Sequence, residues 1–237
     1  MFFKRKPLQY ITKLFVTVNP DEQFDFEWIA ARLFPFCREA PTEYSINYRR
    51  NRPIKKLGTT NREYLFKDIE SVFFWAAGGS VLTIGIGGAP FGTDNARRIF
   101  HFDVEHHAEQ RLSTSELLIN TLAEKLSLQY AYARSLPGNF STFGETRIRH
   151  SLFGMSFKVE QASKTWLLPP QEILDGAIKG IYPVNYWREG VFDRLRRAGI
   201  WLPDRITGNG IVVINAVEGA EIAKRNTSHK QFIHLIP

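Results

Sequence analysis

The chain has 237 residues, 43% of them hydrophobic and 14% aromatic, and its 31 Lys and Arg against 24 Asp and Glu give a formal net charge of +7. A chain of this length buries about 70% of its unfolded surface, so it needs no cross-links to fold, and its single cysteine excludes an internal disulfide. The basic balance favours acidic partners such as nucleic acid, anionic lipid or an acidic protein, without choosing among them.

The hydropathy of the chain predicts a protein that is neither exported nor inserted in a membrane. No run approaches the roughly 18 apolar residues of a membrane-spanning helix. Residues 1–7 carry the charge of a signal peptide, but no apolar run or small-residue cleavage site follows them. Together with the lone Cys37, these features predict a reducing, cytoplasmic location and no membrane partner.

The N-terminal third begins with a predicted strand and helix. Residues 8–18 are rich in β-branched and aromatic side chains, and Asn19-Pro20 after them is a turn signal. Residues 21–32 place apolar side chains at helical spacing, and Pro35 ends that helix. Residues 40–60 are polar, basic and irregular, apart from a short predicted strand at 44–48.

The middle of the chain predicts an antiparallel meander. Two β-rich runs, residues 72–77 and 80–87, flank Gly78-Gly79, and two-residue hairpin turns need the positive φ that glycine adopts. Residues 99–107 alternate in character and form a third predicted strand. These three runs predict consecutive antiparallel strands.

A helix and a returning strand follow. Ser113 and Glu116 fit a capping box, in which the serine caps the helix and the glutamate reaches back to its amide. An apolar stripe then recurs at four-residue spacing at Leu118, Leu122 and Leu126. Residues 130–133 are predicted to return to the sheet as a strand.

The last third contains further short elements. Strands are predicted at residues 151–159, 181–182, 210–217 and 231–236, and helices at 169–177 and 191–198. The hairpins favour an α+β fold, with an antiparallel or mixed β-sheet and helices packed mainly on one face. We predict a single domain over residues 1–237, with residues 40–60 as an irregular basic insertion.

One strand carries a group of potential metal ligands. Period-two alternation places His101, Asp103, Glu105 and His107 on the same face of the third meander strand. Two imidazoles and two carboxylates could hold a divalent metal, which would make the chain a metal-dependent enzyme. Alternate residues of a strand lie nearly 7 Å apart, so one ion reaches at most two of them. The favoured interpretation is the solvated face of a half-buried strand.

Specific residues argue against the other catalytic and cofactor-binding motifs. The glycine-rich segment 85–92 has Pro90 where a dinucleotide fingerprint needs its third glycine, and a phosphate loop's Gly-Lys-Ser/Thr is absent. Cys37 lies beside Arg38 but among phenylalanines, which favours a core thiol. We therefore predict no catalytic residue and no cofactor.

Basic and aromatic residues mix in two segments that could bind nucleic acid. Rings that stack on bases and cations that bind phosphate occur together at Tyr44, Tyr48, Arg49, Arg50, Arg52, Lys55 and Lys56. The predicted C-terminal helix adds Arg194 and Arg197. No known nucleic-acid-binding motif supports this interpretation, and a solvated basic loop is the simpler one.

From about residue 73 to residue 217, the order of elements resembles a bacterial immunity-protein family associated with type VI secretion toxins. The resemblance rests on a helix at 117–128 that leads into Tyr130-Ala131-Tyr132, then the stretch Lys179 to Tyr186, a helix, and the strand from Gly210. It implies a cytoplasmic α+β domain that binds and neutralises a cognate toxin. The basic charge departs from the acidic inhibitors of nucleases and implies a toxin that is acidic at the contact or is not a nuclease.

The leading hypothesis is therefore a non-enzymatic cytoplasmic binding protein of the immunity kind, whose partner is a protein. Such an inhibitor needs a surface patch with aromatic and arginine anchors. Tyr186 and Trp187 are predicted to lie in loops or at element ends, where they could serve as anchors. A nucleic-acid-associated protein is the alternative, and a metal-dependent enzyme is the third possibility.

Overall fold

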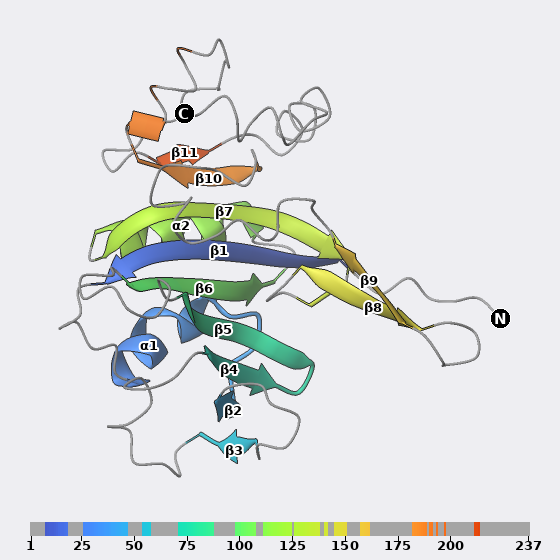
Figure 1. The fold of residues 1–237 in the computed structure, drawn as a ribbon. Helices are drawn as coiled ribbons and strands as arrows, with labels where there is room; N and C mark the ends of the chain where they lie inside the picture. Colours follow the sequence, from blue (N-terminus) through green and yellow to red (C-terminus); the bar gives the residue numbers. More distant parts are fainter. Residues whose placement is uncertain are drawn as a thin grey trace, which may run out of the picture.

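In a computed structural model of the chain, most of the described strands belong to one large β-sheet (Figure 1). The structure describes residues 8–18, 26–46, 54–57, 71–87, 98–107, 111–124, 126–137, 140–141, 145–150, 157–161, 182–188, 190–191, 193, 197 and 211–213. Statements below about structure concern these residues. The predicted helix at 169–177 and the predicted strand at 231–236 lie outside them.

The main sheet has nine strands in the order β11-β10-β7-β1-β6-β5-β4-β2-β3. Their bounds are β1 Leu8–Val18, β2 Glu43–Ile46, β3 Lys55–Lys56, β4 Ser71–Ala76, β5 Gly79–Gly87, β6 Arg98–His106, β7 Ser127–Pro137, β10 Val184–Trp187 and β11 Ile211–Val213. Every pairing between these strands is antiparallel. The sequence left antiparallel and mixed sheets open, and the described strands form an antiparallel one.

The first strand of the chain lies in the middle of the sheet. Strand β1 pairs with β6 on one side and with β7 on the other, so Leu14 lies opposite both Phe102 and Ala131. It therefore joins the β10–β7 side of the sheet to the β6–β4 side. The strand is long enough for this central position, with 11 residues, and its sequence LQYITKLFVTV is rich in apolar side chains.

The predicted meander is present as β4, β5 and β6. The β4–β5 turn lies at Ala77-Gly78, one residue earlier than predicted, and Gly79 begins β5 with φ +124°. That angle lies in a region where a side chain is strained, which explains a glycine at this position. The register shifts between Phe74 and Trp75, so the hairpin contains a bulge next to its turn.

The helices are few and short. They are α1 Phe26–Arg32, the 3-10 helix η1 Phe34–Phe36 and α2 Arg111–Ala123. The predicted cap at Ser113 is wrong, because α2 already begins at Arg111 and Ser113 lies inside its first turn. Residues 190, 191, 193 and 197 are also helical, and the last three of them lie within the predicted helix at 191–198. No helix among the described residues has the length and apolar character needed to cross a membrane.

The hydrophobic core forms on the sheet face that carries the even-numbered residues of β1. Leu14 and Val16 pack there with apolar side chains from β6, β5, β4 and β7. Leu118, Ile119 and Leu122 of α2 belong to the same buried cluster, as does Leu33 before η1. The apolar stripe predicted for the helix thus contributes Leu118 and Leu122 to the core, while Leu126 packs against it from beyond the helix end.

The opposite face of the sheet is also buried at its centre. Residues directly opposite each other in antiparallel strands share a face, and one such row runs through Asn185, Tyr132, Lys13, Asp103 and Thr83. All five are buried. The middle strands are therefore covered on both faces, which explains why polar side chains there pair with one another.

A second, two-stranded sheet stands apart from the main one. Strands β8 Thr146–His150 and β9 Phe157–Gln161 pair with each other in antiparallel register. We call these two strands the arm. Figure 1 shows the arm extending from the side of the main sheet where β7 ends. The sequence predicted a single strand at residues 151–159, so both strands of the arm were misplaced.

Candidate functional site

The four potential metal ligands of the third meander strand are not brought together. His101, Asp103 and Glu105 share one face of β6, as alternation predicted, but His107 lies beyond the end of the strand and is exposed. Asp103 and Glu105 are 1% and 5% exposed, so the prediction of a solvated face is wrong. Segments distant in the chain, such as the one that carries Arg38, pack against this face, which one strand's alternation could not reveal.

The two carboxylates of this strand are each held by a cation. Lys13 Nζ lies 2.9 Å from Asp103 Oδ1, and the side chains of both are almost fully buried. Arg38 Nε lies 2.9 Å from Glu105 Oε1. Burial raises the pKa of Glu105, and the nearby Arg38 opposes that shift. These ion pairs satisfy charges that burial would otherwise make very costly.

His101 occupies a different environment. Its ring covers Gly85 on the neighbouring strand, where a Cβ would lie only 2.0 Å from His101 Cε1. The Phe15 ring lies 6.2 Å away between centroids. Burial lowers the pKa of His101. Among the described residues no three His, Cys, Asp or Glu side chains are placed to hold a metal, and the geometry gives the metal-dependent enzyme no support.

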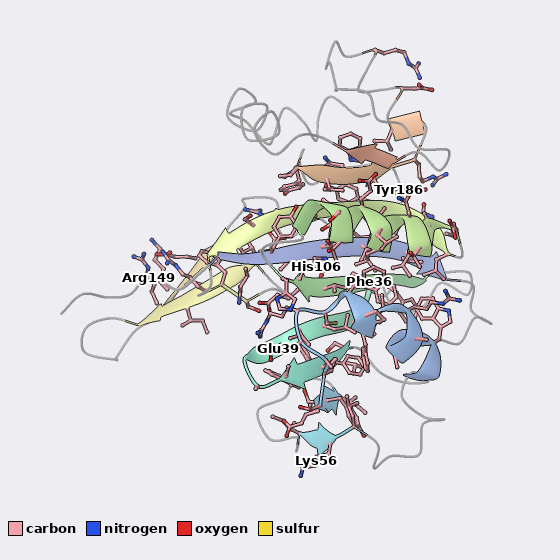
Figure 2. The ribbon with its side chains drawn as sticks, turned by 180° about the vertical axis from the view of Figure 1, so that it is seen from behind. Phe36, Glu39, Lys56, His106, Arg149 and Tyr186 are labelled. Atoms are coloured by element: carbon pink, nitrogen blue, oxygen red, sulfur yellow. The ribbon has the colours of Figure 1, made fainter. Side chains whose placement is uncertain are left out.

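The core face carries a polar network that the sequence did not predict. His106 Nδ1 lies 2.7 Å from the carbonyl oxygen of Phe36, and Nε2 lies 2.6 Å from Thr12 Oγ1. A carbonyl only accepts, so Nδ1 carries the proton of the neutral ring. Ser115 Oγ of α2 lies 2.8 Å from the same Thr12 oxygen. Figure 2, in which the molecule is seen from behind, shows His106 and Phe36 beside one another. The network ties η1, β6, β1 and α2 together.

Cys37 lies near this network as a partly buried thiol packed against the core. Burial raises its pKa to about 12, with Glu105 adding to the shift and Arg38 opposing it. Its Sγ donates to the carbonyl oxygen of Leu33 at 3.5 Å. A thiol with so high a pKa is not a nucleophile near neutral pH. This agrees with the core position predicted from its phenylalanine neighbours.

Tyr186 and Trp187 lie at the end of an element, as one of the two predicted alternatives has it, but they are buried and not available as anchors. Both belong to β10, where all four residues are buried, and Trp187 has an exposed fraction of 0%. Tyr186 is part of the hydrophobic core cluster. Burial raises the pKa of Tyr186. Neither side chain is placed to anchor a partner, because the strand that carries them pairs on both sides with β7 and β11.

The basic segment at residues 44–56 is divided between the core and the sheet edge. Tyr44 is 1% exposed and packs in the hydrophobic core, so it cannot stack on a base. Lys55 and Lys56 form β3, the outermost strand on this side, and Lys56 is exposed at that edge (Figure 2). The other predicted contacts, Tyr48, Arg49, Arg50 and Arg52, lie outside the described residues.

The predicted basic helix is described only in part. Arg197 is exposed, and its Nε donates to the carbonyl oxygen of Asp193 at 3.4 Å. Arg194 lies outside the described residues, so the structure neither joins it to Arg197 nor separates them. Nothing among the described residues connects Arg197 to Lys56, which lies at the opposite end of the strand order from β10.

The arm exposes two large apolar side chains that sequence reasoning missed. Ile148 and Val159 lie directly opposite each other across β8 and β9. They are 61% and 48% exposed, among the few large hydrophobic residues with such exposure. A directly opposed pair has its Cβ atoms about 5 Å apart, so the two side chains form one continuous apolar spot.

The other face of the arm is charged. Arg147 and Arg149 both bond to Glu160, with Arg149 Nε 2.8 Å from Glu160 Oε1 and Arg147 Nε donating to Glu160 Oε2 at 2.5 Å. Lys158 is exposed and lies opposite Arg149. The Arg147 guanidinium also lies 5.0 Å from the centroid of the Phe140 ring. Figure 2 shows Arg149 well away from His106 and Tyr186.

Glu145 fixes the base of the arm to the main sheet. It precedes β8 directly, and its side chain is fully buried. Tyr132 donates its hydroxyl to Glu145 Oε1 at 2.5 Å, and Arg134 Nη1 lies 3.0 Å from Oε2. Glu145 has φ 49°, in the left-handed region that costs a non-glycine residue about 1 kcal/mol. Two charge-assisted bonds hold the chain in that conformation.

The comparisons with known proteins add no relatives. No protein-family model, curated protein or solved structure matched the chain.

The arm was missed although the sequence contains a signal for it. Residues 157–160 alternate between apolar and polar types, whereas residues 146–150 contain Ile148 as their only aliphatic side chain. Each strand is only five residues long, which is too short to distinguish from a loop without its partner. The pairing of the two runs is what makes them strands, and that pairing is a tertiary property.

Proposed function

We propose that the chain is a non-enzymatic binding protein that neutralises a bacterial toxin by forming a stoichiometric complex with it. The observation that carries the proposal is the apolar spot formed by Ile148 and Val159 on the arm. Apolar side chains that stay exposed to water do not stabilise a two-stranded ribbon, which by itself is only marginally stable. Exposed apolar residues with charged neighbours are typical of protein-binding surfaces.

The apolar spot of the arm favours a protein over a nucleic acid. Non-specific nucleic-acid binding is carried by cations that contact phosphate, and exposed aliphatic side chains such as Ile148 and Val159 add little to it. Apolar side chains at the centre of a protein interface, in contrast, contribute to its binding energy. The arm therefore fits the immunity hypothesis better than the nucleic-acid one.

The order of described elements supports the resemblance to the immunity family. Helix α2 leads into β7, and β10 and β11 follow in that order. Asn185, in the stretch that carried part of the resemblance, bonds through its side chain to both the amide and the carbonyl of Tyr182. That asparagine closes the turn into β10, a structural reason for such a stretch in a fold of this kind.

Two further features belong to this proposal. The helices cover mainly the sheet face that carries Leu14, and the protein acts in the cytoplasm, where a producing cell needs protection from its own or a neighbour's toxin. The first is supported by the packing of α2 and η1 against the core cluster, to which Leu118 and Leu33 belong. The second follows from the proposed neutralisation of a toxin.

The test is toxin neutralisation. Each gene that lies beside this one is expressed in a sensitive bacterium with and without the chain, which identifies any toxin among their products. We expect growth only when the chain is present, and a complex of defined stoichiometry when the purified proteins are mixed and measured by light scattering. An unrelated basic protein of similar size serves as control. If no neighbouring toxin is neutralised or bound, the proposal is wrong.

A nucleic-acid-associated protein remains the second candidate, because Lys56 is exposed on the outermost strand of the sheet. Its test is a gel-shift titration with RNA and DNA at several salt concentrations. Binding that weakens steeply as salt rises would support it, since phosphate contacts release counterions. A lack of shift at low salt would exclude it.

A further inference from the structure

We infer that the arm is the primary contact with the partner, and that it enters a cleft of a protein that is apolar where it faces Ile148 and Val159 and acidic where it faces Arg149 and Lys158. This inference rests on the proposed function and adds the location of the contact and the chemistry of the partner. Its basis is the combination, on one ribbon, of the Ile148–Val159 spot with a net positive charge.

The charge of the arm follows from its described side chains. Arg147, Arg149 and Lys158 lie on the face that also carries Glu160, so three cations face one carboxylate. The Arg149 side chain is 59% exposed even though it bonds to Glu160. Lys158 is exposed as well. A partner carboxylate can therefore reach both cations from solvent without breaking the pairs inside the arm.

A positive ribbon on a positive protein attracts an acidic surface over a long distance. The formal net charge of the chain is +7, and this field raises the rate at which an acidic partner finds it. Close contact then depends on the apolar spot, because apolar burial supplies most of the affinity, while the charges on the other face of the arm set its orientation in the cleft. The two features act at different stages of the same association.

A second copy of the chain fits the arm poorly. Two copies each carry +7, so they repel each other. An arm-to-arm contact would also bring Arg149 and Lys158 near their own counterparts. An acidic partner is attracted both by the net charge of the chain and by the cations of the arm.

The base of the arm is arranged to hold this surface in place. Glu145 is fully buried and bonded to Tyr132 and Arg134 of β7, directly before β8 begins. A ribbon with a fixed base loses less conformational freedom on binding than a free one. The two apolar side chains are too few for a whole interface of about 800 Å² per partner, so they act as its anchor.

The apolar part of the inference is tested with the double variant Ile148→Ser/Val159→Ser and the purified toxin encoded by the neighbouring gene. Calorimetry should show Kd raised by at least about tenfold, the loss expected when a central anchor is truncated. The matched control is Leu117→Ser on α2, since Leu117 is 59% exposed against 61% for Ile148. The control should bind as the wild type does.

The charged part is tested with Arg149→Glu/Lys158→Glu. We expect a slower association rate and a weaker dependence of that rate on salt, because steering is electrostatic. The control is Lys56→Glu, which changes an exposed charge on β3 instead of on the arm. Circular dichroism and thermal unfolding should match the wild type for every variant, since exposed substitutions change stability by only about 0.5 kcal/mol.

The outcomes separate the inference from the proposed function. If no toxin binds the wild type, both are wrong. If the toxin binds and the arm variants bind as tightly as the wild type, the proposed function stands and the arm is not the contact. A dimer in light scattering that Ile148→Ser/Val159→Ser abolishes would identify a second copy as the occupant. Salt-sensitive RNA or DNA binding lost in Arg149→Glu/Lys158→Glu would identify a nucleic acid. Either result overturns the inference.

Discussion

At the scale of single residues, the buried polar groups are the least expected feature of this protein. His106 lies in the core, bonded to Phe36 and Thr12, and burial lowers its pKa to about 4. The backbone bond to Phe36 opposes that shift but is the smaller effect. The ring is therefore neutral in the folded protein under conditions in which a free imidazole is partly charged.

This difference makes stability depend on pH. The ordinary pKa of the imidazole is 6.5, and in the fold it is about 4. Between these values the unfolded chain binds a proton that the folded chain does not. The free energy of unfolding should therefore fall as pH is lowered from about 6.5 to about 4, by at most about 3 kcal/mol from this residue. Urea unfolding at pH 7, 6, 5 and 4.5 measures it.

The control for this prediction is His106→Asn. The variant should be less stable at pH 7, because it loses part of the network, but its stability should change less across the same window. His101 contributes in the same direction as His106, since its pKa is also lowered. Glu105 contributes in the opposite direction, since its pKa is raised. Parallel profiles for wild type and variant would show that His106 is not responsible.

Sequence patterns placed the residues of β6 correctly on its faces but predicted the exposure of one face wrongly. The pattern of β6 correctly placed His101, Asp103 and Glu105 on one face, because alternation is local geometry. It wrongly made that face solvated, because burial depends on what packs above it. The partners Lys13 and Arg38 lie far from Asp103 and Glu105 in the chain. No spacing rule along one strand could identify them.

At the scale of elements, the β5–β6 pair shows how tightly the opposite sheet face is packed. Gly85 and His101 are directly opposed, and the His101 ring fills the space that a side chain at Gly85 would need. The glycine is therefore required by close approach and not by backbone conformation. The glycine-rich run after the hairpin has this packing reason at its first position, in place of the phosphate-binding role that Pro90 excludes.

Gly85→Ala should consequently destabilise the fold by about 1–3 kcal/mol, the usual cost of overpacking a filled site. The new Cβ would lie 2.0 Å from His101 Cε1, so the ring or the strand must move. In Gly85→Ala/His101→Ala, most of the added cost should disappear, because the clashing ring is gone. Chemical unfolding of the two single variants and the double variant measures the coupling.

Gly190→Ala is the matched control for this substitution. A Cβ at Gly190 meets no heavy atom within 4 Å, and the residue is helical. The change should be neutral or stabilising, since alanine favours a helix over glycine by up to about 1 kcal/mol. Additive costs for Gly85→Ala and His101→Ala would mean that the ring is not what opposes the new methyl group.

Element prediction succeeded where the signal is local and strong. The β4–β5 hairpin, the strand β6 and the helix α2 were all predicted, because each has a glycine turn or an apolar period of its own. The cap at Ser113 and the two strands of the arm were misplaced. Helix ends and five-residue strands depend on contacts with other segments, so their own residues specify them weakly.

At the scale of the whole molecule, β1 determines how the sheet holds together. It lies between β6 and β7, and Leu14 is in the core cluster with side chains from both sides of the sheet. Strands on the β4 side and on the β10 side should therefore unfold together. A single unfolding transition for both sides would support the prediction of one domain.

Leu14→Ala should lower the stability of both sides equally, by about 2–5 kcal/mol, as large-to-small core substitutions do. Trp75 on β4 and Trp187 on β10 report the two sides. Fluorotryptophan labelling and ¹⁹F NMR during urea unfolding can follow both resonances, assigned by substituting each tryptophan in turn. We expect the same midpoint for both, shifted by the same amount. Leu117→Ala on the exposed side of α2 should shift neither, and a shift of only one resonance would indicate two separate units.

The sequence by itself determined the β-rich character of the protein, its hairpin, its principal helix and its positive charge. These follow from local alternation, helical period, glycine turns and composition, which need no knowledge of distant contacts. Only the tertiary structure decided that β1 is central, that the β6 face is buried and ion-paired, that Tyr186 and Trp187 are in the core, and that Ile148 and Val159 meet on an exposed arm. Each of those depends on which segments, distant in the chain, lie side by side, and burial and pairing are properties of that arrangement alone.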